Sequence, residues 1–141
     1  MPTYGTLQTM VRVGPQCSIE ILNPSSNFRS CKLDAVIDSG AVMTCIPSSH
    51  LQRIGNLISG EDVILSDANG HKIRQETYYI HLDFLDFKAS IEQIRVISLP
   101  GKSYALIGRD ILNRYKLAFN GKRKLWALEC GPDFECPNSV D

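Results

Sequence analysis

The sequence predicts an all-β protein, a closed or nearly closed β-barrel that carries one or two short helices. Short apolar runs that alternate with polar residues recur along the chain, and clusters of Gly, Pro, Asn and Ser separate them. Two stretches have helical spacing, and neither is long enough for more than about two turns. Many short strands with so little helix bury their apolar faces best in a sheet that closes on itself.

The first half of the chain contains three stretches with strand periodicity, at residues 1–13, 17–21 and 31–37. We expect the first to be an edge strand or arm, because Gly14-Pro15 ends it. Residues 47–55 then favour one or two turns of helix. Ser48 or Ser49 is available there as the N-terminal cap.

The second half begins with a predicted β-hairpin over residues 62–80. Its turn carries Asn69-Gly70, the strongest short hairpin signal in the chain. Three further strands, one short helix and a second hairpin follow, at residues 78–84, 88–97, 105–107, 110–115 and 117–128.

The bulk composition indicates one globular domain. The chain has 141 residues, 43% of them apolar, and its 15 basic and 15 acidic side chains give no net charge. That length is enough to bury a real core. We expect residues 1–130 to form one domain and the polar residues 131–141, which contain Gly and two Pro, to be a disordered tail.

Charge and hydropathy give no reason to expect nucleic-acid or membrane partners. The short basic run Lys122-Arg123-Lys124 is better interpreted as a solvated turn than as a binding patch. No apolar run approaches the length of a membrane span, and no basic segment leads into an apolar one as in a secretory signal. We therefore expect a cytoplasmic protein.

Neither a metal site nor a cofactor is expected. The cysteines are odd in number and fit no zinc spacing, so we expect reduced thiols; they are Cys17, Cys31, Cys45, Cys130 and Cys136. A bond between Cys130 and Cys136 is the less favoured state. His50, His71 and His81 have no ligand spacing, and the chain has no nucleophile, P-loop or dinucleotide motif.

An apolar strand leads directly into a carboxylate where Ala35-Val36-Ile37 meets Asp38-Ser39-Gly40. A carboxylate at the edge of a core is costly to ionise, so its position there needs a reason. The glycine permits a sharp turn and the close approach of another backbone, and the serine offers a short hydroxyl.

Asp38-Ser39-Gly40-Ala41, with apolar residues before it, resembles the Asp-Ser/Thr-Gly-Ala signature of retropepsin-like aspartic proteases. A second segment, Tyr104 to Leu112, resembles the apolar-apolar-Gly-Arg-Asp/Asn-apolar-Leu segment of the same family. Their order and separation fit one retropepsin protomer, and the resemblance covers residues 16–129. It implies a closed β-barrel protomer with a mobile hairpin, the flap, that closes over substrate.

The resemblance implies an aspartic endopeptidase. In such enzymes two carboxylates share one proton: the ionised one takes a proton from water, and the protonated one polarises the peptide carbonyl. This chain has one Asp-Ser-Gly, so the second Asp38 has to come from another protomer across a two-fold axis. The implied partners are a second copy of the chain and a peptide or protein substrate.

The resemblance assigns catalytic roles to Asp38, Ser39 and Gly40. Asp38 activates water, Ser39 bonds across the dimer, and Gly40 offers its carbonyl to the substrate. A simpler interpretation is a tight turn in which the Asp38 carboxylate accepts hydrogen bonds from the Ser39 and Gly40 amides. The joint occurrence of two motifs favours the catalytic interpretation.

Substrate contacts are assigned, by the same resemblance, to the flap tip and to the cleft. The residues are Ser66, Asp67, Ala68, Asn69 and Gly70 in the flap and Ala41, Val42 and Leu106 in the cleft. Ile64 is a further candidate for a specificity pocket. We expect the N-terminal arm or the hairpin 116–128 to build the sheet that joins the protomers.

The chain departs from the viral pattern at two places. The viral arginine that corresponds to Arg109 pairs with an acid four residues after the catalytic one, and Val42 stands there in this chain. Arg109 and Asp110 are therefore assigned structural support, with Asp34 or Asp110 as open choices of partner for Arg109. The polar flap tip resembles those of bacterial members. The alternative function is a protease-like module that binds peptides or dimerises without turnover.

Overall fold

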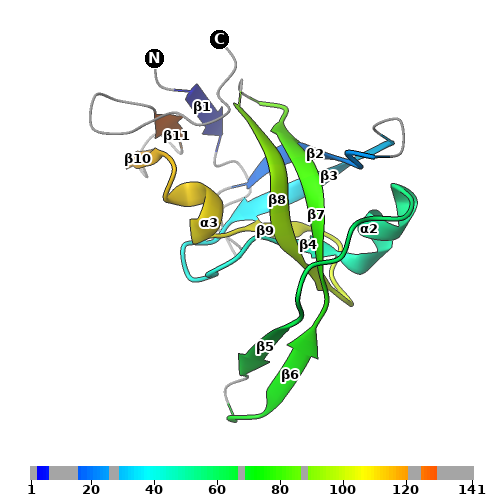
Figure 1. Ribbon diagram of the computed structural model, residues 1–141. Coiled ribbons are helices and arrows are strands. Elements are labelled where there is room, and N and C mark those ends of the chain that lie inside the picture. The colour runs from blue at the N-terminus through cyan, green and yellow to red at the C-terminus, as the bar shows by residue number, and fades with distance from the viewer. Residues whose placement is uncertain are drawn as a thin grey trace.

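The computed structural model describes residues 3–6, 16–25, 29–66, 69–86, 89–120 and 125–129. The predicted all-β fold with a closed barrel is confirmed: in these residues six strands close a barrel in the order β2-β3-β9-β4-β8-β7 (Figure 1). The barrel strands are β2 (Gln16–Leu22), β3 (Ser30–Ile37), β4 (Cys45–Pro47), β7 (Thr77–Phe84), β8 (Ala89–Leu99) and β9 (Ala105–Ile107).

The barrel encloses a cluster of buried apolar side chains drawn from its strands and from both helices. β2 alternates buried and half-buried residues, as its sequence predicts, with Ile19 and Ile21 fully buried. At the end of β3 the alternation stops, and Ala35, Val36 and Ile37 are all buried. That segment pairs with β2 on one edge and with β9, in parallel, on the other. Ala35 and Ile37 belong to the core cluster, whereas Val36 is buried outside it, so both faces of this segment are covered. A strand covered on both faces is apolar throughout, which explains the uninterrupted run.

Two short helices lie in the described part of the chain, α2 (Ser48–Arg53) and α3 (Arg109–Leu112). The helix predicted over residues 110–115 thus begins and ends earlier. The prediction that Ser48 or Ser49 caps α2 is wrong, because Pro47 is the N-cap and no side chain bonds to the helix end. The Ser48 hydroxyl is instead hydrogen-bonded to the Ser98 hydroxyl of β8, at 2.7 Å between the oxygens.

A separate three-stranded sheet is built from the two ends of the described chain. β1 (Thr3–Thr6), β11 (Leu125–Glu129) and β10 (Lys116–Asn120) pair in that order, and all pairs are antiparallel. The described strands of the two segments that the sequence offers for a dimer sheet, β1 from the arm and β10 and β11 from the hairpin, therefore lie in one sheet. Among the described strands, β1 and β10 each have one unpaired edge. The tail expected at residues 131–141 lies outside the described residues.

A two-stranded hairpin, β5 (Val63–Ser66) and β6 (Lys72–Gln75), projects from the barrel at the end opposite the terminal sheet (Figure 1). Its base is fixed to β7. The hydroxyl of the buried Thr77 donates to the Glu61 carbonyl at 2.7 Å, and the Gly60 amide donates to the Thr77 carbonyl at 3.0 Å. The hairpin beyond this base is largely exposed.

Candidate active site

Asp38 stands where β3 leaves the barrel. Its amide donates to the Ile107 carbonyl at 3.0 Å, so the last pairing of β3 with β9 extends into the turn. The residue is half-buried, whereas Ser39 and Gly40 are exposed. Asp38 thus lies at the surface end of a buried strand, and its backbone is held against β9.

The turn itself is closed by hydrogen bonds to both ends of Asp38. The Gly40 amide donates to Asp38 Oδ1 at 2.9 Å, and the Ala41 amide donates to the Asp38 carbonyl at 3.1 Å. A Cβ on Gly40 would lie 3.1 Å from Asp38 Oδ1, which is a tight contact. The local turn that the simpler interpretation requires is therefore present in part, with the amide of Gly40 as donor.

The segment after the turn is bound to α3 through backbone and side chain. The Arg109 and Asp110 amides donate to the carbonyls of Ala41 and Val42, at 2.9 and 3.3 Å. The Asp110 carboxylate accepts from the Thr44 amide, 3.0 Å from each oxygen, and from the Thr44 hydroxyl at 2.8 Å. That hydroxyl in turn accepts from the Gly108 amide at 3.1 Å. Asp110 thus connects the helix to the strand after the turn.

Thr44 is the residue that sequence reasoning missed. It is fully buried, and its bonds to Asp110 and Gly108 join the two motifs that carry the resemblance. A polar residue in the apolar run between Ala41 and Ile46 was the available signal. A Cβ on Gly108 would lie 2.6 Å from the Met43 carbonyl carbon, so only glycine allows this approach.

Arg109 has neither of the partners that the sequence left open. Its side chain is exposed. The ion pairs within the described residues are Arg74–Asp62 and His81–Asp83, so Arg109 pairs with neither Asp34 nor Asp110. Asp110 is occupied by Thr44, and Val42 replaces the acid of the viral pattern, with 66% of its surface exposed.

Cys45 lies behind the turn, at the start of β4. Burial, together with the negative charges of Asp110 and Asp38, raises the pKa of this thiol to about 11. A thiol in this state is neutral at physiological pH and is not a nucleophile.

The residues predicted to contact substrate occupy two regions. Ala41, Val42 and Leu106 lie beside the Asp38 turn, and Leu106 is the register partner of both Val36 and Cys45. Ser66, Asn69 and Gly70 are exposed on the hairpin, and Ile64 is 61% exposed there. Asp67 and Ala68 lie outside the described residues.

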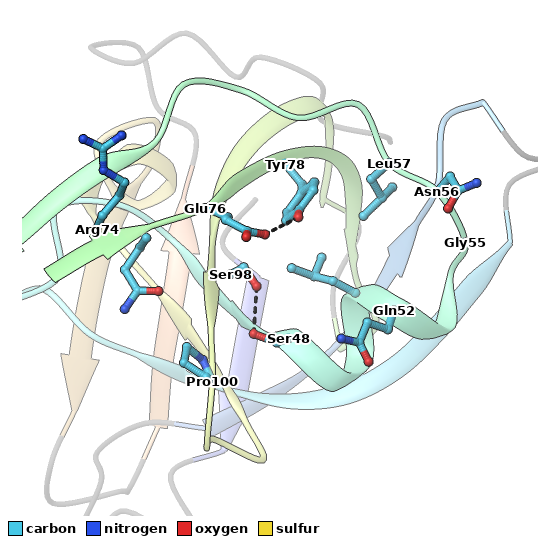
Figure 2. Close-up of a pocket in the computed structure, with 12 residues that line it drawn as sticks. Ser48, Gln52, Gly55, Asn56, Leu57, Arg74, Glu76, Tyr78, Ser98 and Pro100 are labelled. Carbon is cyan, nitrogen blue, oxygen red and sulfur yellow. Dashed lines mark hydrogen bonds between the residues drawn. The ribbon is translucent and has the colours of Figure 1, made fainter.

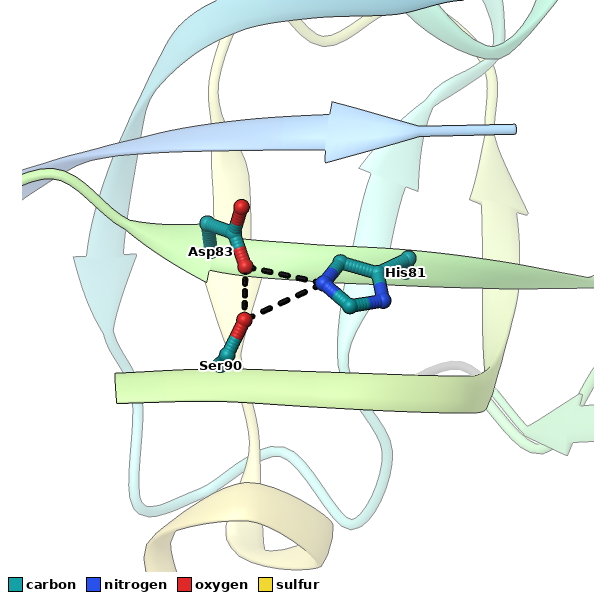
Figure 3. A network of polar contacts seen from close by, with 3 residues as sticks. All are labelled: His81, Asp83 and Ser90. Carbon is teal, nitrogen blue, oxygen red and sulfur yellow. Dashed lines mark hydrogen bonds and ion pairs between the residues drawn. The ribbon is translucent and has the colours of Figure 1, made fainter. Parts of the chain in front are cut away.

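A second polar cluster, His81, Asp83 and Ser90, resembles a catalytic triad only in composition (Figure 3). His81 Nε2 lies 2.9 Å from Asp83 Oδ1 and 3.1 Å from Ser90 Oγ, and Ser90 also donates to Asp83. A triad needs the acid and the nucleophile on different ring nitrogens, so this cluster is not a nucleophile site. In the described part of the chain, no group of three His, Cys, Asp or Glu residues is arranged to hold a metal, and no helix has the length and apolar character to cross a membrane.

No protein-family model and no curated protein matches the chain. Among solved structures, a retropepsin-like aspartic protease from Rickettsia conorii matches over 80% of this chain and 90% of its own, with a TM-score of 0.50 and 15% identity. The chain has a retropepsin-like fold.

Two viral structures also match this retropepsin-like chain. The EIAV protease, solved with an inhibitor, has a TM-score of 0.49 and 17% identity, over 73% of this chain and 88% of its own. A foamy viral protease-reverse transcriptase, solved with an RNA/DNA hybrid, has a TM-score of 0.48 and 22% identity, over 72% of this chain. The match spans 12% of the length of that foamy viral chain.

Proposed function

We propose that the protein is an aspartic endopeptidase whose active site is shared between two protomers. Asp38 of each protomer supplies one carboxylate. Two carboxylates at close range share one proton, because like charges at that distance do not both ionise. The ionised carboxylate takes a proton from the attacking water, and the protonated one polarises the scissile carbonyl.

The observation that carries this proposal is the placement of Asp38. Its Asp-Ser-Gly turn ends a barrel strand in a retropepsin-like fold, and the turn is fixed by the Ile107 carbonyl beneath it and by Gly40 within it. A carboxylate that has to meet its copy at hydrogen-bond distance needs such a rigid support. The single Asp-Ser-Gly of this chain supplies half of the pair.

The terminal sheet supports the dimeric form of the proposal. Unpaired strand edges at β1 and β10 present backbone donors and acceptors to a second chain. If two such sheets paired across a two-fold axis, the same surface of each protomer would form the interface, as an isologous interface requires.

The proposed substrate is an extended peptide bound between the Asp38 turns and the β5–β6 hairpins, which act as flaps. Exposed apolar side chains occur beside the turn, at Val42, and on the hairpin, where Ile64 lies on one face and Leu65 and Ile73 lie on the other. Whichever face of the hairpin turns toward the Asp38 turns, it carries an apolar side chain for the substrate to cover. An extended peptide would pair with backbone on both sides as an added strand.

The deciding experiment is cleavage of a mixed peptide library at mildly acidic pH by wild type and Asp38→Asn, with sedimentation velocity on the same samples. We expect cleavage by the wild type and a loss of at least about a hundredfold in the variant, which keeps its dimer. Activity is expected to be highest at acidic pH, because one carboxylate of the pair must hold a proton.

Two results would contradict the proposal. Equal cleavage by both proteins removes Asp38 from the chemistry. A dimer without cleavage by either protein favours the alternative function, a module that binds peptides without turnover.

A further inference from the structure

A pocket of about 730 Å³ opens between α2, the base of the β5–β6 hairpin and the end of β8 (Figure 2). It does not include the Asp38 turn. The residues that line it are Ser48, Leu51, Gln52, Gly55, Asn56, Leu57, Arg74, Gln75, Glu76, Tyr78, Ser98 and Pro100.

One side of this pocket is an unpaired strand edge. Gln75 is the register partner of Val63 in β5, whereas the next carbonyl, that of Glu76, accepts from the Ser98 amide of β8 at 2.9 Å. Successive residues of a strand direct their backbone groups to opposite edges. Arg74 therefore directs its N–H and C=O to the same edge as Glu76, toward the pocket. Within the described strands, β6 pairs with β5 and with no strand on this second edge.

The end of β8 explains why this edge is left open. The residue that would pair next with Arg74 is Pro100, and proline has no N–H to donate. The chain then turns away at Gly101, whose φ is +77°. The pairing of β8 with this part of the chain therefore ends at the hydrogen bond between Ser98 and Glu76, and β8 leaves the position beside Arg74 open.

The other walls match an extended polypeptide. Carboxamide side chains of Gln52, Asn56 and Gln75 offer donors and acceptors, as backbone amides require. The apolar part of the lining is supplied by Leu51 and Leu57. The Ser48 and Ser98 hydroxyls bond to each other across the floor (Figure 2). A mixed lining of this kind and a volume of this size suit a segment of a few residues.

The far wall is held rigid by a buried side chain. Asn23 is fully buried, and its Nδ2 donates to the carbonyls of Ile54 and Asn56 at 2.9 and 2.8 Å. Its Oδ1 accepts from the Ser25 amide at 2.9 Å. The loop after α2 is therefore a preformed wall, which lowers the cost of binding.

We propose that this pocket binds an extended segment of the polypeptide substrate, outside the segment held in the cleft, as a strand added at Arg74. The inference rests on the proposed function and names its substrate class: long, unfolded polypeptides. Because β6 belongs to the hairpin that acts as the flap, a segment bound there also restrains the flap over the scissile bond.

Hydrogen exchange tests the added strand directly. The Asp38→Asn protein is measured by NMR with and without saturating casein, an unfolded polypeptide that this variant leaves intact. We expect exchange at the Arg74 amide to slow at least about fivefold, because the amide gains a partner. Unchanged exchange at Arg74 overturns the inference, whether the Asn69 and Gly70 amides respond or not.

Kinetics test the role of the pocket in catalysis. Wild type, Gln52→Trp and Ser49→Trp are compared on casein and on an octapeptide spanning one casein site that the wild type cuts. Gln52 is an exposed residue of α2 that lines the pocket, and Ser49 is an exposed residue of α2 outside it. We expect Gln52→Trp to lower the ratio of kcat/KM for casein to that for the octapeptide about fivefold, and Ser49→Trp to leave it unchanged.

An equal ratio in all three proteins overturns the inference while leaving the endopeptidase proposal intact. Absence of cleavage by the wild type contradicts the endopeptidase proposal instead. In that case slower exchange at Arg74 still establishes a polypeptide site in this pocket.

Discussion

At the scale of single residues, Asp110 is the side chain near the site whose removal we expect to lower stability most. Asp110→Ala leaves the buried Thr44 amide and hydroxyl without their acceptor. We expect the free energy of unfolding to fall by about 2–4 kcal/mol, because buried donors without partners are costly. Urea denaturation measures it. Asp34→Ala, at an exposed position, is the control with an expected change below about 0.5 kcal/mol; equal effects would contradict the role of Asp110.

From the raised pKa values of two buried thiols we predict how stability changes as the pH becomes alkaline. Burial, with nearby Asp86 and Asp34, raises the pKa of Cys17 to about 12 from an ordinary 9.0, and the pKa of Cys45 is raised to about 11. A pKa raised on folding contributes stability that is complete below pH 9.0 and is lost as the pH rises through the folded values. Urea midpoints should therefore fall between pH 9 and 11, and less steeply in Cys45→Ala. The same slope in both proteins would contradict the assignment.

Residue roles could be predicted from the sequence only where a role is local. Asp38 and Gly40 are two residues apart, and their turn bond follows from the Asp-Ser-Gly pattern. The bond between Thr44 and Asp110 joins positions 66 residues apart, so no local pattern contains it. The partner of Arg109 was left open for the same reason. The role of Ser48 was missed because its hydroxyl bonds to a distant strand rather than to its own helix.

At the scale of elements, the approach of α3 to the segment before β4 decides the geometry of the turn. Gly108→Ala would place a Cβ 2.6 Å from the Met43 carbonyl carbon and 2.9 Å from the Thr44 amide nitrogen. Backbone does not move aside as a flexible side chain does, so we expect a loss of about 3 kcal/mol of stability, accompanied by reduced cleavage.

Gly101→Ala is a matched control for that variant. Gly101 has open space around it and a φ of +77°, so alanine there bears only the strain of a left-handed conformation, about 1 kcal/mol. Thermal unfolding of both variants ranks the two effects. A larger loss in Gly101→Ala would show that α3 accommodates the extra carbon.

Strand positions followed from the sequence more closely than strand neighbours did. The predicted segments 105–107 and 78–84 match β9 and β7 to within one residue, because period-two alternation and turn residues are local signals. The parallel pairing of β3 with β9 and of β4 with β8 is set by the closure of the barrel. Those pairings place Leu106 beside Val36, which no spacing in the sequence indicates.

At the scale of the whole molecule, the proposed function predicts how the activity of mixed dimers depends on their composition. When wild type and Asp38→Asn are mixed in equal amounts and allowed to exchange, random pairing leaves about one quarter of the dimers with two aspartates. We expect the specific activity of the mixture to fall to about one quarter of that of the wild type. A fall to about one half would indicate that each protomer works alone.

The hydrogen bonds that fix the Asp38 turn also determine at what stage of synthesis the turn can form. Gly108 and Asp110 leave the ribosome long after Asp38, and the Ile107 carbonyl that holds the turn follows at a similar distance in the chain. Contacts that close such long loops form late in folding, after local structure. A nascent chain that has not yet released Ile107 therefore carries the complete Asp-Ser-Gly sequence without the hydrogen bond that holds its turn. On the proposed function, such a chain has no formed active site.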